Sequence, residues 1–402
     1  MAENVVMTQE EFASLTPGEV QIIDIRDASS TAYGIIPGAK NIPSAELMDR
    51  AGELDAAKPA ILYCARGIFS VEAAENLRGR GINAFSLDEG YAGWVMAQMQ
   101  RDEDEAERRY KIEESIRKTY HRRLFSQFAS AIRTYDLLQP GDRVAVCISG
   151  GKDSMLMAKL LQELQRHSEV PFELVYLVMD PGYNEINRQK IESNAALLHI
   201  PITVFETNIF DVANNSDKSP CYLCARMRRG HLYKKAQELG CNKIALGHHF
   251  NDVIETTVMS MFYGSQLQAM PPKLHSTNFP GMTLIRPMYC IREDDIIAWR
   301  RYNELEFIQC ACRFTEACTI CDNGGGGSKR QEVKVLLRRL MRDNPNIENS
   351  IFRSIHAVSL DTMPGYKSEG VEHSFLERFD RVEEELKTKK ASPEGEAVRE
   401  AD

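Results

Sequence analysis

The sequence predicts an α/β protein with two domains, each built on a mainly parallel β-sheet. Three observations support this fold class. The chain has 402 residues, which is more than one hydrophobic core usually holds. Strand-like and helix-like segments alternate over residues 1–98 and again over residues 143–305, as is typical of parallel sheets covered by helices. A heavily charged stretch separates the two regions.

The first domain, residues 5–98, contains short apolar runs that we expect to form strands. These runs are VQIIDIRD, PAILYCA and INAFSLD, and their composition suits strands buried in a sheet. The segment SVEAAENLRGRG lies between the last two runs and predicts a helix that ends at a glycine. Residues 101–137 predict one long connecting helix, because they are rich in charges of both signs that would face solvent.

The second domain, residues 138–345, alternates between strand and helix over most of its length. We expect strands at residues 143–148, 173–179, 201–206, 243–248 and 283–289. Residues 310–328 interrupt this pattern with four cysteines and the run Gly324 to Gly327, and residues 329–343 then predict a basic helix. Residues 365–402 are polar and charged, which predicts a disordered tail.

Composition favours a cytoplasmic protein without membrane contact. No apolar run approaches the roughly 20 residues of a membrane span, and the acidic N-terminal segment lacks the features of a signal peptide. Ten cysteines in such a protein favour metal binding or catalysis over disulfides. The net charge is −9, but the acidic excess lies in residues 1–100 and in the tail. A polyanion would therefore meet the middle of the chain.

The stretch Ser149-Gly-Gly-Lys-Asp-Ser154 follows the first predicted strand of the second domain and leads directly into a helix. Two glycines allow the backbone to curl closely around a ligand. Backbone amides and the helix N-terminus would then form an anion cradle. The spacing is that of neither a Walker A loop nor a GxGxxG turn. An ordinary strand-to-helix turn is the alternative interpretation of the glycines alone.

Residues 243–264 predict a strand that ends at Gly247-His248, followed by a helix with Asp252 and Glu255 in its first turns. Acidic residues at this place suit the helix dipole, so helix capping is one interpretation. The other is a polar site beside the end of the strand. The sequence pattern by itself leaves both open.

Cysteines form two groups in the second domain. Cys221 and Cys224 lie three residues apart at the start of a predicted helix, so their thiols would share one side. The helix N-terminus and the following basic residues would favour the thiolate, which is the form that binds metals. The pair suits a redox site or half of a zinc or iron–sulfur site. The second group could hold zinc alone or complete the first, and comprises Cys310, Cys312, Cys318 and Cys321.

SGGKDS resembles the signature of the PP-loop ATP pyrophosphatases, which transfer AMP to a substrate oxygen. The segments CYLCARMRRGHLY, IALGHHFND, MFYG, MPPKL and IRPMYCIREDDI follow in order, and residues 115 to about 345 resemble the tRNA 2-thiocytidine synthetases, the TtcA family. The resemblance implies a PP-loop domain of the adenine-nucleotide α-hydrolase-like, Rossmann type. It implies Asp153 and Asp252 as catalytic residues, with Asp153 near Mg²⁺. It also implies that ATP is bound by Ser149, Gly150, Gly151, Lys152, Asp153, Ser154, Gly247 and His248.

The TtcA family carries a labile 4Fe–4S cluster on three cysteines, two of them in the CxxC motif. The resemblance implies Cys221 and Cys224 as two ligands and Cys310 as the third, with Cys312 as the alternative. The segment CACRFTEACTICDNGGGG is longer and richer in cysteine than the family pattern. It therefore leaves room for a separate metal site at Cys318 and Cys321.

Residues 5–98 resemble a rhodanese domain through IIDIRDASSTAYGIIPGAKNIP, YCARGIFS and GYAGW. The resemblance implies that Cys64 carries sulfur as a persulfide, which loop amides and a helix dipole would stabilise; a buried structural thiol is the alternative. Ile35 stands where the family has histidine, and Phe69 stands where it has a second loop arginine, while Arg66 remains. These departures favour a persulfide carrier over an efficient thiosulfate enzyme.

Together the motifs predict an ATP-dependent tRNA sulfurtransferase that forms 2-thiocytidine. ATP would adenylate the base carbonyl, and sulfur from Cys64, passed directly or through the cluster, would displace AMP. Basic helices at residues 226–235 and 329–342 would contact tRNA phosphates. A cysteine desulfurase or another persulfide donor and a homodimer are further expectations. Alternatives are thiolation of another tRNA position or molecule, an adenylating nitrogen ligase with structural zinc, and a zinc-stabilised RNA-binding protein.

Overall fold

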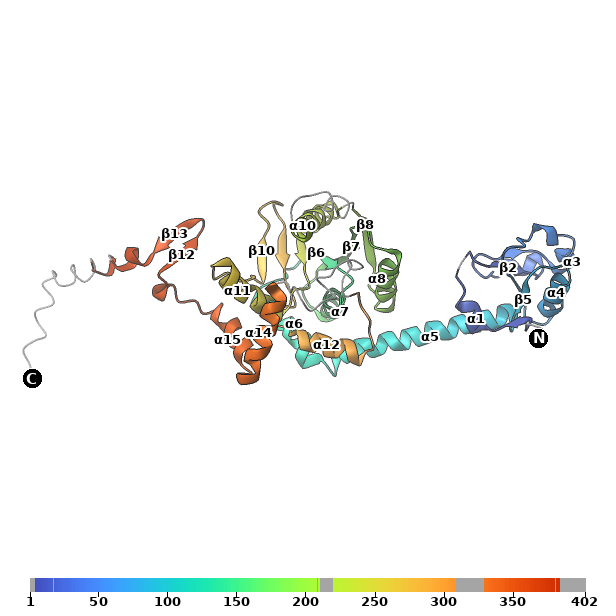
Figure 1. Ribbon diagram of the computed structural model, residues 1–402, viewed down its shortest axis with the longest axis horizontal. Helices are drawn as coiled ribbons and strands as arrows, with labels where there is room; N and C mark the ends of the chain where they lie inside the picture. Colours follow the sequence, from blue (N-terminus) through green and yellow to red (C-terminus); the bar gives the residue numbers. More distant parts are fainter. Residues whose placement is uncertain are drawn as a thin grey trace, which may run out of the picture. The chain divides into compact units, whose positions relative to one another are not determined.

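The computed structural model describes residues 4–16, 18–207, 209, 220–308, 329–379 and 381–383, and within residues 220–226 it describes the backbone alone. The chain divides into two compact units, residues 1–112 and residues 113–402 (Figure 1). None of the helices in these described ranges is long and apolar enough to cross a membrane.

The first unit is built on a five-stranded parallel sheet in the order β1-β5-β4-β2-β3. All three strands expected from its apolar runs are present, as β2, β4 and β5, and so is the helix α4 between β4 and β5. The elements of this unit are β1 (Val6–Met7), α1 (Gln9–Ala13), β2 (Gln21–Asp24), α2 (Ala28–Thr31), β3 (Lys40–Asn41), α3 (Ser44–Leu47), η1 (Ala51–Glu53), β4 (Ala60–Tyr63), α4 (Phe69–Arg78), β5 (Ala84–Leu87) and the start of α5 (Gly90–Arg117).

Strand β4 lies at the centre of this unit and is buried on both faces. Ile61 and Tyr63 pack into one apolar cluster, whereas Leu62 and Cys64 pack into another. This alternation follows from the two-residue period of a strand, and burial of both faces is typical of parallel sheets. The strand therefore delivers Cys64 to the C-terminal edge of the sheet.

The charged segment between the domains is not one continuous helix, so that prediction is wrong. Helix α5 begins at Gly90 and ends at Arg117, and a π-helical turn η2 (His121–Phe125) and α6 (Ser126–Thr134) follow it. Tyr120 leaves the helical conformation with φ −105° and ψ 7°. Leu124 and Phe128 are fully buried beyond this break, and burying them outweighs the regular helical continuation that the charge pattern suggests.

The second unit is built on a six-stranded sheet in the order β10-β11-β9-β6-β7-β8. All neighbours are parallel except β10 and β11. The five expected strands are present, although β9 and β11 are shorter than predicted, and the exposed strand β10 was not predicted. The strands are β6 (Arg143–Ile148), β7 (Glu173–Asp180), β8 (Ile202–Glu206), β9 (Lys243–Ala245), β10 (Lys273–His275) and β11 (Thr283–Ile285).

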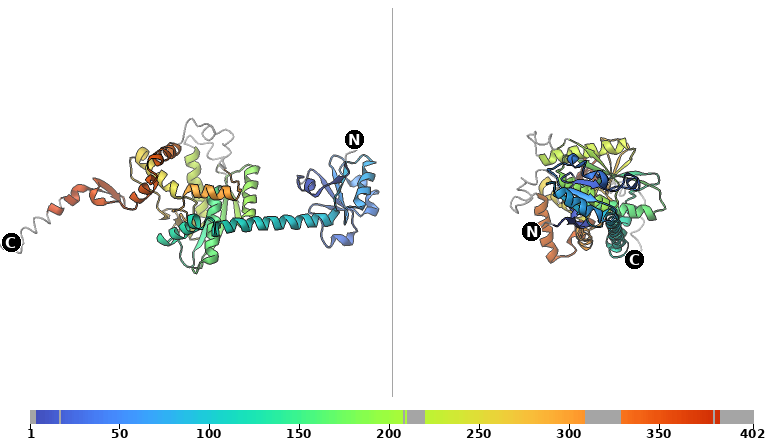
Figure 2. Two further views of the ribbon diagram at one scale, coloured as in Figure 1. Left: turned by 90° about the horizontal axis from the view of Figure 1, so that it is seen from below. Right: turned by 90° about the vertical axis from the view of Figure 1, so that its right-hand side faces the viewer.

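Helices surround this sheet, as Figures 1 and 2 show. Helix α10 packs on one face through Tyr233 and Ala236, in the same cluster as Cys147 and Cys241. Both cysteines are buried core thiols, and burial raises the pKa of Cys147 to about 12. The helices are α7 (Lys152–His167), α8 (Glu185–Leu197), α10 (Pro220–Glu238), α11 (Phe250–Gly264), α12 (Glu293–Tyr302), α14 (Lys329–Asp343) and α15 (Ile347–Ser354).

Strand order places a crevice between β6 and β9. The chain runs from β6 to β7 and β8 on one side and returns through α10 to β9 on the other side. In open α/β sheets, ligands bind at the C-terminal ends of strands where the order reverses in this way. Both sequence motifs of the second domain, at Ser149 and at Gly247, follow these two strands.

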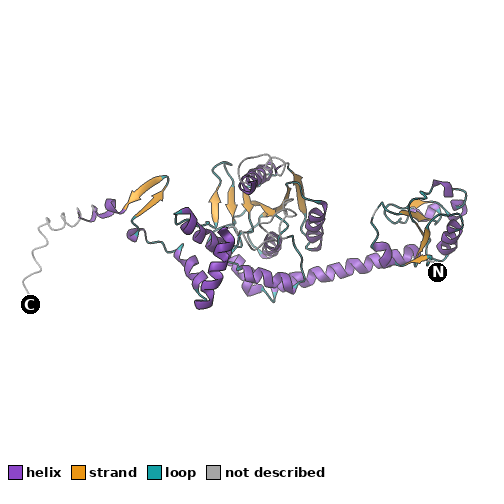
Figure 3. Cartoon of the chain, viewed as in Figure 1, coloured by secondary structure: helices purple, strands orange, loops and turns teal. Residues whose placement is uncertain are grey.

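The C-terminal segment is ordered further than predicted. After a short η4 turn (Leu360–Thr362), β12 (Gly365–Ser368) and β13 (Val371–Ser374) form an antiparallel hairpin, drawn in orange in Figure 3. Tyr366 stacks on its cross-strand partner His373 at a ring distance of 4.7 Å. The predicted disorder is therefore wrong for residues 365–374, because cross-strand contacts offset the polar composition. Residues 384–402 lie outside the described part of the chain.

Candidate functional site

The loop after β6 has a backbone shape that requires glycine. Gly150 has φ +82°, and a Cβ atom there would lie 2.6 Å from both Ile191 Cγ1 and Ile308 Cδ1. A side chain at this position would combine left-handed strain with a collision. The loop therefore packs against the apolar side chains of Ile191 and Ile308. Its shape is that of a tightly curled turn, as predicted for SGGKDS.

Hydrogen bonds of two serines close this loop. Ser154 Oγ accepts from the Ser149 backbone N–H at 3.1 Å and donates to the Gly151 carbonyl at 3.0 Å. Ser149 Oγ lies 3.1 Å from the same hydroxyl. The turn leads directly into the N-terminus of α7 at Lys152, where the first backbone N–H groups of a helix lack intrahelical partners and attract anions.

The end of β9 comes close to this turn. A Cβ atom on Gly247 would lie 3.2 Å from the Ser154 backbone nitrogen and 3.3 Å from the Asp153 carbonyl carbon, so glycine allows the two strand ends to meet. His248 follows, and burial lowers its pKa to about 4. Its imidazole is therefore neutral near pH 7, and its Nδ1 has no hydrogen-bond partner among the residues that the structure describes.

Asp252 is both a capping residue and a residue of the crevice. Its Oδ2 accepts from the His249 backbone N–H at 3.1 Å at the start of α11, which bears out the capping interpretation. His249 Nε2 lies 3.5 Å from Asp252 Oδ2 and 3.9 Å from Asp153 Oδ1. Burial acts to raise the pKa of Asp252, but His249, His248 and Arg330 together outweigh it and bring this pKa below its usual value.

A cavity of about 440 Å³ opens between these elements, which is the size of a small-molecule site. Six of the residues predicted to act on ATP line it, together with Arg228 and Arg229 of α10. These six are Ser149, Asp153, Ser154, Gly247, His248 and Asp252. Gly150 and Gly151 shape the loop instead. The Lys152 ammonium Nζ contacts Asp153 Oδ2 at 3.0 Å and Glu293 Oε1 at 3.3 Å.

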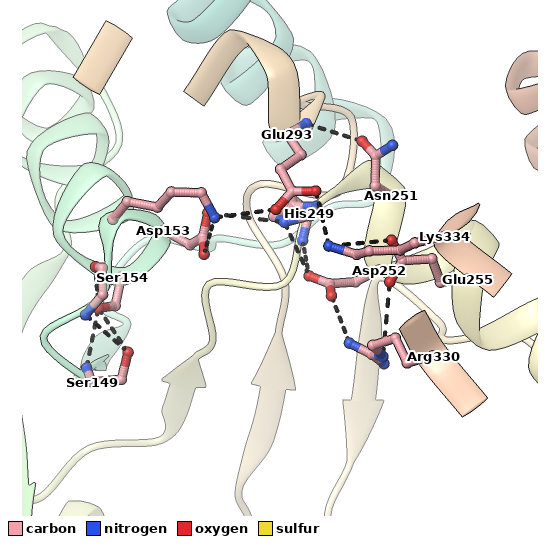
Figure 4. Close-up of polar contacts among 12 residues, drawn as sticks. Ser149, Asp153, Ser154, His249, Asn251, Asp252, Glu255, Glu293, Arg330 and Lys334 are labelled. Atoms are coloured by element: carbon pink, nitrogen blue, oxygen red, sulfur yellow. Dashed lines mark hydrogen bonds and ion pairs between the residues drawn. The ribbon is translucent and has the colours of Figure 1, made fainter. Parts of the chain in front are cut away.

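A network of alternating charges joins Glu293, Lys334, Glu255, Arg330 and Asp252 (Figure 4). Glu293 of α12 also contacts Lys334 Nζ at 3.0 Å, and Lys334 lies 3.6 Å from Glu255 Oε1. Arg330 Nη1 contacts Asp252 Oδ1 at 2.9 Å. Because Arg330 and Lys334 both belong to α14, this helix supplies the cations and α11 and α12 supply the carboxylates.

This network corrects the prediction that all basic residues of residues 329–342 contact tRNA. Arg330 and Lys334 face α11 instead, because Val333 and Leu337 on the same side of α14 pack against Phe250, Ile254 and Val258. The spacing of residues 330, 333, 334 and 337 marks one helix face, and this signal could have revealed the arrangement. Arg338, Arg339 and Arg342 are exposed.

The network also perturbs its own carboxyl groups. Burial raises the pKa of Glu255 to about 7, against the opposing effect of Lys334. Burial acts on Glu293 in the same direction, but the hydrogen bond and charge of Lys334, together with the charges of Lys152 and His249, outweigh it and lower the pKa of Glu293. The two carboxyl groups therefore titrate in different ranges although they share a lysine.

The side chains predicted to bind an iron–sulfur cluster lie outside the part of the chain that the structure describes. Cys221 and Cys224 belong to the first turns of α10, whose backbone is helical from Pro220, so their three-residue spacing places them on one side of that helix. Their side chains are not described. Among the described residues there is no group of three or more His, Cys, Asp or Glu that could hold a metal ion. The second cysteine group, Cys310, Cys312, Cys318 and Cys321, lies outside the described residues.

Cys64 of the first unit lies at the start of a loop between β4 and α4. The Ser70 hydroxyl donates to its Sγ at 3.5 Å and in turn accepts from Ser86 Oγ at 2.8 Å. Burial acts to raise the pKa of the Cys64 thiol, but hydrogen bonds from Ser70 and from loop backbone amides outweigh it and lower this pKa. Such surroundings stabilise a thiolate or a persulfide anion.

Two glycines hold the Cys64 loop in place, and an apolar rim surrounds it. A Cβ atom on Gly90, at φ +58°, would lie 2.3 Å from the Cys64 carbonyl oxygen, and one on Gly67, at φ +78°, would lie 2.7 Å from the Glu89 nitrogen. Ile68 and Phe69 at the start of α4 are mostly exposed. The rim therefore presents apolar side chains where the usual domain has a cation.

Comparisons with known proteins match both units of the chain. A family model described as a PP-loop domain matches residues 112–312, and a rhodanese-like domain model matches residues 8–97. The chain thus combines an ATP-using PP-loop domain with a rhodanese-like domain. It is 37% identical to a tRNA-cytidine(32) 2-sulfurtransferase of Citrifermentans bemidjiense over 240 residues, 59% of this chain and 90% of that protein. The chain belongs to the tRNA-cytidine(32) 2-sulfurtransferase family.

Other relatives carry the same description. The protein from Cellvibrio japonicus is 38% identical over 243 residues, which cover 59% of this chain and 76% of that protein. Among solved structures, the U34-tRNA thiolase NcsA from Methanococcus maripaludis with its 4Fe-4S cluster matches with a TM-score of 0.46 and 22% identity, covering 57% of this chain and 76% of that chain.

Proposed function

We propose that the protein is an ATP-dependent tRNA sulfurtransferase that converts a cytidine to 2-thiocytidine. One observation carries this conclusion. The Ser149–Ser154 turn and the Gly247–Asp252 segment meet around a single cavity at the point where the strand order reverses, in a chain whose relatives are tRNA-cytidine(32) 2-sulfurtransferases.

ATP phosphates fit the turn at the N-terminus of α7. Backbone amides and the helix dipole attract the phosphates there, and the hydroxyls of Ser149 and Ser154 add hydrogen-bonding groups at the wall of the cavity. Asp153 suits Mg²⁺, because its buried Oδ1 has no hydrogen-bond partner in the described part of the chain and carboxylates are preferred Mg²⁺ ligands. The bound metal would neutralise phosphate charge.

The chemistry needs two displacements. The carbonyl oxygen of cytosine C2 attacks the α-phosphate, and pyrophosphate leaves. Sulfur then attacks C2, and AMP leaves with the original oxygen. The protein contributes position and electrostatics to both steps: Arg228 and Arg229 line the same cavity as the loop and offset phosphate charge, while Asp252, fixed by capping α11, orients the groups around Asp153.

Cys64 carries the sulfur as a persulfide in this proposal. Attack of its terminal sulfur on C2 joins the base to Cys64 through a disulfide, and a thiol then supplies two electrons to release the thiolated base. The low pKa of Cys64 and the Ser70 hydrogen bond favour the anionic persulfide that this attack needs.

An iron–sulfur cluster fits the cysteines of the second unit. Cys221 and Cys224 on one side of α10 would hold it with Cys310, or with Cys312 as the alternative third ligand, because thiolates are the usual cluster ligands. A four-iron cluster held by three of these cysteines would leave one iron without a protein ligand and could bind sulfide there. Cys318 and Cys321 remain available for a separate metal site.

Further partners follow from this activity. The exposed residues Arg338, Arg339 and Arg342 of α14 and the basic residues of α10 suit contacts to tRNA phosphates. A cysteine desulfurase or another persulfide donor would load Cys64. We also propose a homodimer that acts in the cytoplasm.

Mass spectrometry of tRNA nucleosides tests the proposal. The anaerobically purified protein, incubated with unmodified tRNA, ATP, Mg²⁺ and a persulfide donor, should produce 2-thiocytidine, and the Asp153→Ala variant should produce none. A nitrogen-substituted base in place of a thiolated one would point to a nitrogen ligase, and a thiolated base other than cytidine would contradict the proposed acceptor.

A further inference from the structure

We propose that Glu293 and Lys334 are positioning residues that control how readily Lys152 reaches the nucleotide. Helix α14 is thereby a working part of the ATP site. The inference rests on the proposed function, because it takes the Ser149–Ser154 turn as the site of the ATP phosphates. It assigns a role to two residues, on α12 and on α14, that lie outside both sequence motifs.

Lys152 is the first residue of α7, and its side chain is paired with two carboxylates. Its ammonium contacts Glu293 at 3.3 Å and Asp153 at 3.0 Å, and it is not among the described residues that line the cavity. To bind a phosphate oxygen, the Lys152 ammonium must exchange Glu293 for the nucleotide. The strength of its pairing with Glu293 therefore opposes ATP binding.

Glu293 bridges two lysines. One carboxylate oxygen contacts Lys152 and the other contacts Lys334 Nζ at 3.0 Å. The Glu293 side chain is 19% exposed, and that of Lys334 is 24% exposed. A carboxylate this buried is costly to leave without a counter-ion. When Lys152 moves to the phosphates, Lys334 remains with Glu293, so the exchange does not leave Glu293 without a counter-ion.

The positions of both groups are fixed by contacts other than their own ion pair. The Glu293 backbone N–H donates to Asn251 Oδ1 at 2.9 Å at the start of α12. Lys334 is held by the packing of Val333 and Leu337 against α11, one turn after Arg330 pairs with Asp252. A substitution of Lys334 should therefore remove its charge and leave α14 in place.

The proposal predicts effects of opposite sign from neighbouring residues. Lys334→Met leaves Glu293 with Lys152 as its counter-ion, so ATP should bind about tenfold more weakly. Glu293→Gln leaves Lys152 paired with Asp153 alone, so ATP should bind more tightly than to the wild type. In the Glu293→Gln background and in the Lys152→Met background, Lys334→Met should not change the ATP affinity further. Glu293 and the ATP phosphates no longer compete for Lys152 in either background.

The test is a set of double-mutant cycles on the full-length protein. The dissociation constant of a non-hydrolysable ATP analogue is measured without tRNA, and the melting temperature of each variant confirms folding. Lys111→Met is the matched control, because Lys111 also forms an ion pair, with Glu107, but on an exposed helix surface. Its affinity should equal that of the wild type. Lys334→Gln replaces Lys334→Met if the latter fails to fold.

Two results would overturn the inference. One is an affinity of Lys334→Met for the ATP analogue that equals that of the wild type. The other is a loss of this affinity on Lys334→Met that persists in both the Glu293→Gln and Lys152→Met backgrounds, because such a loss would be a general effect of charge. A wild-type protein that binds no ATP analogue would instead contradict the proposed function, so the two failures are distinguishable.

Discussion

Cys64 shows how single residues set the chemistry of the first unit. Its sulfur is buried, which alone disfavours the anion, yet the Ser70 hydroxyl and several backbone N–H groups point at it and lower its pKa. Ser86 holds the Ser70 hydroxyl in turn. The residue is thus prepared to carry an anionic sulfur without any cationic side chain in contact with it in the described structure.

Ser70→Ala should raise the pKa of Cys64. The variant loses the hydroxyl hydrogen bond that favours the thiolate, so alkylation of Cys64 by iodoacetamide at pH 7 should slow. The rate should fall several-fold, up to about tenfold if the pKa of Cys64 rises by one unit. The rate is followed on the Cys64 peptide by mass spectrometry, with Ser29→Ala, at an exposed serine, as the control. An alkylation rate equal to that of the wild type would contradict the assigned role of Ser70.

Glu255 should make the stability of the second unit depend on pH. Its pKa is raised from 4.5 to about 7 by burial, so the folded state favours the protonated carboxyl. Its contribution to the free energy of unfolding is full below pH 4.5 and is lost as the pH rises through 7. Glutamine stays neutral at every pH. The free energy of unfolding of Glu255→Gln should therefore increase relative to that of the wild type between pH 5 and pH 8, by up to about 3 kcal/mol. Denaturant titrations measure this difference, and a difference that is constant with pH would contradict it.

At the scale of elements, the Ser149–Ser154 turn depends on the left-handed backbone at Gly150 and on the apolar side chains that contact it. Gly150→Ala forces a Cβ atom against Ile191 and Ile308 at φ +82°, so it should lower the free energy of unfolding by about 1–3 kcal/mol. Gly151→Ala is the matched control: Gly151 has φ −80°, and its Cβ contacts would lie at 3.6 Å and beyond. Equal losses in the two variants, measured by denaturant titration, would contradict this account of the turn.

The elements also show how far sequence reasoning reaches. The apolar runs that became β6 and β7 are largely buried, so periodicity and composition locate them well. Strand β10 has three exposed residues, and its formation depends on pairing with β11, which a local pattern does not contain. The break after Arg117 depends in the same way on burial of Leu124 and Phe128 against the rest of the unit.

The residues of the candidate site divide in the same way, into those that a local motif predicts and those that only tertiary packing brings together. Residues that form a contiguous motif, such as Ser149, Asp153 and Ser154, were predicted and do line the cavity. Glu293 and Lys334 belong to distant segments that meet only through the packing of α12 and α14 around α11. The sequence pattern therefore gave Glu293 no role and assigned Lys334 to a surface for tRNA.

At the scale of the whole molecule, two chemistries share one chain. The first unit offers a cysteine with a lowered pKa, and the second offers a cavity at the reversal of strand order. Helix α5 runs from Gly90 to Arg117 and so belongs to both units. The division explains why activation of the base and supply of sulfur should be separable by substitution.

Cys64→Ala should slow thiolation at least tenfold when a persulfide is the sole sulfur donor. ATP-dependent formation of AMP should be retained with tRNA and excess inorganic sulfide, because sulfide supplies the nucleophile without Cys64. Both products are measured in one assay of the full-length protein, with the wild type alongside. Unchanged thiolation from the persulfide would remove the first unit from the mechanism.

The central claim is that the oxygen of the base leaves with AMP, and an isotope experiment tests it most directly. A tRNA whose target cytidine carries ¹⁸O at C2 is thiolated with ATP, and the AMP that forms is analysed by mass spectrometry. The account predicts one ¹⁸O atom in AMP for each 2-thiocytidine formed. Unlabelled AMP accompanying the thiolated base would contradict activation of that oxygen by ATP.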